Sequence, residues 1–479
     1  MKMVGKRTAS ALVAALCLVS FSLISCSSQQ PGPETGTGGP AASAVTPTSA
    51  VGSAAAASPA GTASAAASSP SPTPAPTKAP PAATPSAASA PTVALPTATP
   101  TATPAPTEVP PTPTQVVAKQ KGKVVLGYYV SYDTTSWMSL QAHADALDYV
   151  ALQVVSPDAC GNIATQDDLT LLEFAHSRGI GVLPSIFTSN RWLNHQILTS
   201  EASSSRLVQQ LTDYVVEEGY DGLDVDLEDV EPTDRKALTT FVALLSESLH
   251  GQGKMLTMAV PAKPSDVTTG WAGAYDYAAL APHVDLFTIM SYAYTTSVSP
   301  PGSTAPLPWV DKVTAFATSQ IPPHKVLVGV PFWGYDWNTT VGGRARALRY
   351  PQAAALAAQY GADIATDPSS KSAKFTYVAK LGDQPPSEDK LPPLNHVVKQ
   401  RTQPPCPLKP PTPTPGPTQP PKPTPTPAAI QEHVVWLEDA ASVQTRLDLA
   451  ERHSAGGIGA WRLGQEDPQV WPLLQAWGR

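Results

Sequence analysis

Short apolar runs alternate with amphipathic helical patterns from Lys123 to the end of the chain. This alternation is typical of repeated βα units that build a parallel sheet. Eight runs have the length and composition of buried strands, and eight parallel strands close a barrel. The pattern therefore predicts an α/β fold, a (β/α)8 TIM barrel. The eight runs are Val124–Val130, Asp148–Val155, Gly181–Ile186, Asp221–Leu227, Met255–Val260, Asp285–Ser291, Val326–Phe332 and Gly457–Trp461.

Helical signals lie between these runs. Apolar residues at helical spacing stop before Gly179 and before Gly219, and glycine commonly ends a helix in a left-handed conformation. A third apolar series runs from Leu238 to Leu249. The long stretch between the seventh and eighth runs predicts a small insertion at Tyr350–Lys380 and a Pro/Thr-rich loop at 403–427.

Composition limits this barrel to residues 119–479. The chain has 54 prolines in 479 residues, more than twice the ordinary share, and most of them lie in two tracts. Residues 27–118 alternate Pro, Thr, Ala and Ser and contain few large apolar side chains, so we expect a disordered tether. A polyproline II tether of that length would reach on the order of 280 Å.

The first 26 residues have the pattern of an export signal. Lys2, Lys6 and Arg7 precede an apolar run, Ala11–Ile24, that is too short for a comfortable membrane span. Because Cys26 stands where this run stops, the segment resembles a bacterial lipoprotein signal. We expect an exported protein anchored to the extracellular face of the cell membrane by lipid on Cys26, or located in the cell wall. The alternative is an ordinary signal peptide that contains a cysteine.

The histidines and the net charge bear on whether the protein binds a metal, a cofactor or nucleic acid. The nine histidines are scattered and the net charge is −7, so we predict no metal site, no cofactor and no nucleic acid partner. We expect a monomer. Outside the cytoplasm Cys160 and Cys406 could form a disulfide, but the sequence does not place them within bonding distance.

The candidate catalytic residues lie in the fourth run, where carboxylates alternate with apolar residues. Side chains alternate faces along a strand, so Asp224, Asp226 and Glu228 share one face at about 7 Å intervals. Crowded, desolvated carboxylates raise the pKa of at least one group, which provides an acid able to donate a proton. Glu228 comes last, where barrel active sites lie. The alternatives are a solvated acidic turn or a calcium loop, and an EF-hand loop would need ligands that are missing.

Asp221–Glu228 resembles the D-G-x-D-x-D-x-E signature of glycoside hydrolase family 18, the chitinases and related N-acetylglucosaminidases. The ending of the chain looks most like the bacterial cell-wall and spore-wall branch. The resemblance covers about residues 123–479. Other similar stretches are Gly127–Tyr129, Thr188–Asn190, Met290–Tyr292, Gly329–Trp337 and Gly456–Leu463.

The resemblance implies a role for each matching residue. Glu228 would be the general acid/base, Asp226 would orient the substrate's acetamido group, and Asp224 would be its buried neighbour. Tyr292 would bond the acetamido oxygen, and Trp461 would form the floor beneath the sugar. This family is substrate-assisted, because the acetamide replaces an enzyme nucleophile and configuration is retained.

Two further aromatic residues are candidates for substrate binding. Trp333 follows a predicted strand and could stack on a sugar face. Tyr128 could face the carboxylates or simply pack inside the barrel.

One position departs from the family pattern. Ala293 stands where the family usually has Asp after the tyrosine. We predict a hydrolase of β-1,4-linked N-acetylglucosamine glycans, with peptidoglycan preferred over chitin. The alternative is a lectin-like barrel that binds an N-acetylated polysaccharide without cutting it. Lectin-like members generally lose the final glutamate of the signature, whereas this chain keeps Glu228.

Overall fold

A computed structural model of the protein describes residues 122–386, 391, 393–411 and 428–478. The predicted signal at 1–26 with Cys26, the predicted tether at 27–118 and most of the loop at 403–427 lie outside these residues. Within the described ranges, no helix has the length and apolar character needed to cross a membrane.

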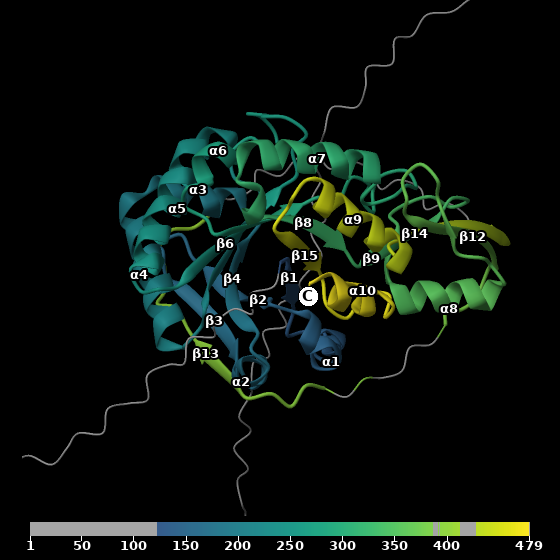
Figure 1. Ribbon diagram of the computed structural model, residues 1–479, viewed down its shortest axis with the longest axis horizontal. Coiled ribbons are helices and arrows are strands. Elements are labelled where there is room, and N and C mark those ends of the chain that lie inside the picture. The colour runs from purple at the N-terminus through teal and green to yellow at the C-terminus, as the bar shows by residue number, and fades with distance from the viewer. Residues whose placement is uncertain (1–121, 387–390, 392, 412–427, 479) are drawn as a thin grey trace, which may run out of the picture. The chain divides into compact units, whose positions relative to one another are not determined.

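The core of the fold is a closed barrel of eight parallel strands (Figure 1). Neighbouring strands pair in the order β1-β15-β8-β7-β6-β5-β4-β2, and pairing of β2 with β1 closes the ring. The predicted TIM barrel is therefore confirmed, and every predicted strand overlaps an observed one to within two residues at each end. The strands are β1 (Val124–Tyr129), β2 (Tyr149–Pro157), β4 (Gly181–Thr188), β5 (Gly222–Leu227), β6 (Met255–Pro261), β7 (Leu286–Met290), β8 (Val326–Pro331) and β15 (Gly457–Trp461).

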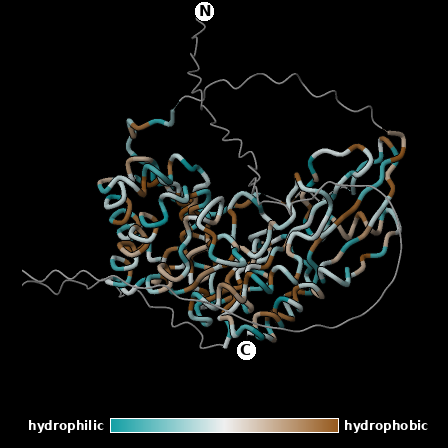
Figure 2. Tube along the Cα trace, turned by 90° about the horizontal axis from the view of Figure 1, so that it is seen from above, coloured by the Kyte–Doolittle hydropathy of each residue, from teal (hydrophilic) through white to brown (hydrophobic). Residues whose placement is uncertain are grey.

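Helices surround the barrel and follow its strands. As predicted, α2 and α4 end before glycines with positive φ, Gly179 at 69° and Gly219 at 77°. Apolar stretches alternate with hydrophilic ones along the chain (Figure 2), as expected where each helix turns one face to the sheet. The helices around the barrel are α1 (Thr134–His143), α2 (Leu169–Ser177), α3 (Arg191–Thr199), α4 (Glu201–Glu217), α5 (Arg235–His250), α6 (Tyr277–Leu280), α7 (Leu307–Gln320), α9 (Ala440–Arg452) and α10 (Val470–Trp477), with short 3-10 turns at Ala144–Ala146, Pro232–Asp234 and Pro323–Lys325.

The insertion between β8 and β15 is larger than the predicted Tyr350–Lys380. It forms an antiparallel five-stranded sheet in the order β10-β9-β14-β12-β11, with its own apolar core beneath α8. The sheet takes strands from both ends of the insertion, so that residues about 100 positions apart pair side by side. Its elements are β9 (Trp333–Asn338), β10 (Arg346–Arg349), α8 (Tyr350–Tyr360), β11 (Ala365–Thr366), β12 (Ala373–Lys380) and β14 (Ile430–Leu437).

The chain then leaves the insertion and lies against the barrel before returning to β14. Strand β13 (Val398–Arg401) pairs antiparallel with β3 (Ile163–Asp168), which itself forms a hairpin with β2. Lys399 and Arg401 form ion pairs with Glu218 at the end of α4. We call residues 393–411 the strap. In Figure 1 the green chain leading to β13 passes α1 and α2.

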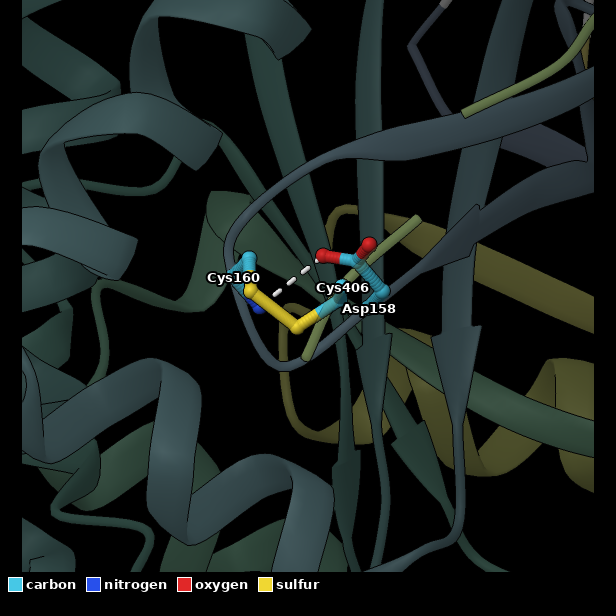
Figure 3. A group of neighbouring side chains, drawn as sticks. All are labelled: Asp158, Cys160 and Cys406. Carbon is cyan, nitrogen blue, oxygen red and sulfur yellow. Dashed lines mark hydrogen bonds between the residues drawn. A yellow bond between two sulfur atoms is a disulfide. The ribbon is translucent and has the colours of Figure 1, made fainter. Parts of the chain in front are cut away.

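A disulfide joins the strap to the barrel. Cys406 bonds to Cys160 in the β2–β3 turn, with Cα atoms 5.7 Å apart (Figure 3). Asp158 completes the cluster by accepting a hydrogen bond from the Cys160 amide. Both sulfur atoms are used in the bond, so this acidic cysteine cluster does not offer thiolate ligands to a metal. The pairing that the sequence left open is thus formed.

Candidate active site

The carboxylates of β5 lie as the alternation predicts. Asp224 and Asp226 are buried, and half-buried Glu228 follows the C-terminal end of the strand. The intervening residues Leu223, Val225 and Leu227 belong to the core between sheet and helices. The acidic residues therefore point into the barrel and toward its mouth.

Asp224 is held by hydroxyl groups from both neighbouring strands. Ser185 of β4 donates to Oδ2 at 2.8 Å, and Thr257 of β6 donates to Oδ1 at 2.6 Å. Burial raises the pKa of Asp224, while these two hydrogen bonds lower it. Both oxygens are satisfied inside the protein, so Asp224 is suited to support its neighbour and not to bind a ligand.

Asp226 keeps one oxygen available. Gln153 Nε2 donates to its Oδ2 at 3.2 Å, and the buried Oδ1 has no hydrogen-bond partner among the described residues. Burial raises the pKa of Asp226 well above its usual value, and the charges of Glu228 and Asp224 raise it further. A buried polar atom without a partner is costly. A ligand N–H group placed here would satisfy it.

The backbone on both sides of Glu228 is anchored. Its amide donates to the Thr188 carbonyl at 2.8 Å, and Asn194 Nδ2 donates to its carbonyl at 2.5 Å. The hydroxyl of buried Tyr275 donates to the Leu227 carbonyl at 2.5 Å. After burial, the charge of Glu228 is the largest cause of the raised pKa of Tyr275. These bonds fix the position of the backbone from which the Glu228 side chain extends.

Tyr128 and Trp461 lie on the opposite side of the barrel interior. The Tyr128 ring lies 5.4 Å from the Trp461 ring, measured between centroids. Burial raises the pKa of Tyr128, followed by the charges of Asp224 and Asp226. Tyr128 also belongs to the apolar cluster inside the barrel, so both interpretations of this residue describe part of its surroundings. Trp461 ends β15 half-buried, at the level of the mouth.

Tyr292 and Trp333 form a second aromatic pair, edge to face, with their ring centroids 5.2 Å apart. Tyr292 follows β7 and lies near enough to Tyr128 to raise its pKa. Trp333 opens β9, so it belongs to the insertion sheet and not to a barrel strand. Ala293, directly after Tyr292, has a φ of 61°, a left-handed conformation in which Asp and Asn are much commoner than Ala. The site residues named from the sequence thus come together, and their individual roles remain predictions.

Five further residues support the carboxylates, and the sequence did not indicate them: Gln153, Ser185, Asn194, Thr257 and Tyr275. Three of them were detectable in principle, because they are polar residues within otherwise apolar strands. Asn194 and Tyr275 reach the site from a helix and a loop, and no local pattern marks them.

A carboxylate row at the C-terminal mouth of a TIM barrel, flanked by aromatic rings, is an arrangement that suits a glycosidase. Residues 124–466 match the family described as Glycosyl hydrolases family 18. The chain belongs to this family, as its signature predicted.

Three known proteins illustrate the relationship. The uncharacterized glycosylase YvbX of Bacillus subtilis (strain 168) is 24% identical over 370 residues, which is 76% of this chain and 93% of YvbX. The cortical fragment-lytic enzyme of the same organism is 27% identical over 286 residues, 59% of this chain and 55% of that protein. The solved chitinase from Chromobacterium violaceum ATCC 12472 shares the fold, with a TM-score of 0.60 and 24% identity over 74% of this chain and 98% of that one.

Proposed function

We propose that this glycosidase is a retaining, substrate-assisted hydrolase of β-1,4-linked N-acetylglucosamine glycans. The observation that carries the proposal is the buried Oδ1 of Asp226, which has no partner among the described residues and lies beside Glu228. The N–H group of a substrate acetamide has the chemistry to satisfy that oxygen. A glycan without the N-acetyl group would leave it unsatisfied.

In the proposed reaction, Glu228 donates a proton to the glycosidic oxygen as the bond to the anomeric carbon breaks. Asp226 accepts the acetamide N–H and turns the acetamide oxygen toward that carbon, where it forms the new bond. Tyr292 would donate to the acetamide oxygen, and Trp461 would support the sugar face. Water then attacks the anomeric carbon from the opposite face and gives a proton to Glu228, while the bond between that carbon and the acetamide oxygen breaks, so configuration is retained.

We propose peptidoglycan as the substrate ahead of chitin. The similarity to a cortical fragment-lytic enzyme supports this choice, although the chain spans only about half of that protein. We also propose that lipid on Cys26 anchors the exported enzyme to the membrane. Such an anchor would keep the enzyme close to its own cell wall.

A product assay tests the proposed reaction. We expect the protein to cleave peptidoglycan and chitin oligomers, with mass spectrometry detecting the products and early NMR spectra showing the β anomer. Fully deacetylated oligomers should resist cleavage, because they lack the internal nucleophile. Release of the α anomer, or equal cleavage of deacetylated oligomers, would exclude the substrate-assisted route.

Two variants assign the proton donor. Glu228→Gln should lower kcat about 100-fold to 10,000-fold while glycan binding persists, because the amide keeps the shape without the transferable proton. Glu231→Gln is the matched control, since Glu231 lies three residues further on and pairs with Arg191. A near-normal rate in Glu228→Gln would exclude Glu228 as the acid. Binding without cleavage by the wild-type protein would favour the lectin-like alternative.

A further inference from the structure

Lys263 is a fully buried lysine that the proposed reaction does not use. It lies two residues after β6, at the C-terminal end of the barrel, which is the end that carries Glu228. Lysine is almost never fully buried unless it is paired, because taking an ammonium group out of water is costly. The contacts of the ammonium group indicate what offsets this cost.

The ammonium group is enclosed by the loop between β6 and α6, residues 262–276. Its Nζ donates to the Tyr275 carbonyl at 2.6 Å and to Asp266 Oδ1 at 3.0 Å. The ring centroid of Tyr277, the first residue of α6, lies 4.6 Å from Nζ. A carbonyl, a carboxylate and an aromatic face together replace water around the ammonium group. The shortest hydrogen bond of the set fixes the backbone of Tyr275.

Tyr275 connects this loop to the turn that carries Glu228. Its hydroxyl donates to the Leu227 carbonyl at 2.5 Å, directly before Glu228. Burial and then the charge of Glu228 raise the pKa of Tyr275, and a hydrogen bond with the Val230 backbone lowers it. One buried hydroxyl therefore contacts both ends of the turn from Leu227 to Val230.

The turn that carries Glu228 has a specific backbone shape. Asp229 has a φ of 54°, a left-handed conformation that is uncommon for residues other than glycine. The side chain of Asp229 forms an ion pair with Arg191. A displaced turn would move the Glu228 carboxyl group, and a misplacement of about 1 Å can lower a rate roughly 100-fold.

A second cation holds the same loop from outside. Arg235, at the start of α5, donates to the Gly273 carbonyl at 3.0 Å and forms ion pairs with Asp266 and Asp276. These contacts do not involve Lys263. We therefore expect the loop to stay folded against the barrel when Lys263 is replaced by an apolar residue, while the hydrogen bond to the Tyr275 carbonyl is lost.

We propose that Lys263 is a positioning residue for the proton donor. Its ammonium group holds the Tyr275 backbone, and the Tyr275 hydroxyl holds the turn from which Glu228 extends. The inference rests on the proposed function insofar as it takes Glu228 as the proton donor. It adds to that function a buried residue that acts on the rate through another side chain.

Kinetics with the chitin tetramer measure the effect on the reaction. Lys263→Met should lower kcat roughly tenfold and change KM less than about twofold, because a displaced acid weakens transition-state stabilisation more than substrate binding. Tyr275→Phe removes the hydroxyl and should lower kcat in the same way. The double variant should have a kcat no lower than the poorer single variant, because both changes break one series of contacts. Lys263→Gln keeps an N–H donor on a shorter side chain, so it should keep part of kcat.

Hydrogen–deuterium exchange tests the same contacts without turnover. Lys263→Met should speed amide exchange at residues 227–230 roughly fivefold, the factor expected for one lost hydrogen bond. Lys254→Met is the matched control. Lys254 directly precedes β6, and its Nζ donates to the Tyr220 carbonyl at 2.7 Å, at the opposite end of the barrel. This control loses the same kind of bond but should keep wild-type kcat and wild-type exchange at 227–230.

The outcomes separate the two proposals. An unchanged kcat or unchanged exchange at 227–230 in folded Lys263→Met would overturn the positioning role, and so would effects of Lys263→Met and Tyr275→Phe that multiply in the double variant. If Lys263→Met does not fold, Lys263→Gln provides the same comparison. A wild-type protein that cleaves no glycan would overturn the proposed reaction. The exchange measurement would then decide by itself whether Lys263 holds the turn that carries Glu228.

Discussion

Gln153 donates a hydrogen bond to Oδ2 of Asp226 at 3.2 Å, across the inside of the barrel from β2 to β5. This single bond orients the carboxylate, and the other oxygen, Oδ1, is left without a partner among the described residues. The bond lowers the pKa of Asp226, whereas burial and the charges of Glu228 and Asp224 raise it by more. Asp226 is thus kept in a costly environment that stability alone would not select.

Asp226→Asn should therefore make the folded protein more stable at neutral pH while impairing cleavage severely. The folded-state pKa of Asp226 lies above its unfolded value near 3.9, so wild-type stability falls as the pH rises above that value. Asparagine does not ionise. The variant should gain free energy of unfolding at pH 7, and this gain should shrink toward pH 4.

Urea unfolding at pH 4 and pH 7 measures this difference. Asp213→Asn is the control, because Asp213 is exposed on α4 and should change stability little at either pH. If Asp226→Asn and wild type had the same free energy of unfolding at both pH values, the ionised Asp226 carboxylate would not destabilise the folded protein.

Ala293→Asp should shift the pH dependence of cleavage. The φ of 61° at Ala293 favours Asp or Asn, so the substitution should not lower stability. The added negative charge next to Tyr292 should raise the pKa of the catalytic acid and move the upper limb of the kcat/KM profile to higher pH. Ala293→Asn fits the same backbone without charge, so its pH profile should match wild type. Identical profiles for the Asp and Asn variants would mean that position 293 does not influence the acid.

Removal of the disulfide should destabilise the protein. Cys160 and Cys406 are separated by 246 positions, so replacing both with Ser frees a long loop in the unfolded chain. We expect the free energy of unfolding to fall by about 2–4 kcal/mol. Urea unfolding of wild type with and without reductant provides the comparison, and the reduced wild type should behave like the double variant. Equal unfolding midpoints for oxidised and double-Ser proteins would contradict a stabilising bond.

Cys26→Ala should release the protein from membranes or leave it unprocessed. Stable attachment by lipid needs more than one acyl chain, which a modified N-terminal cysteine would carry. Detergent phase partitioning should place the wild type in the detergent phase and the variant in the aqueous phase. A wild-type protein found only in the medium, with an N-terminus other than Cys26, would exclude the anchor.

The sequence by itself determined the barrel and the position of its acidic row. Strands such as Gly457–Trp461 and the alternation of Asp224, Asp226 and Glu228 with leucine and valine follow from local rules, because side chains alternate faces along any strand. Those rules act over a few residues and therefore locate each strand closely. The predicted strand ends differ from the observed ones by no more than two positions.

Only the tertiary structure decided which distant residues meet. The Gln153–Asp226 bond and the Cys160–Cys406 pair each join residues 73 or more positions apart. Local periodicity does not predict these long-range contacts, because they depend on how the strands close into a barrel and on where a returning segment can pair. The strap shows this most clearly, since its edge strand forms only where β3 leaves unpaired backbone groups to receive it.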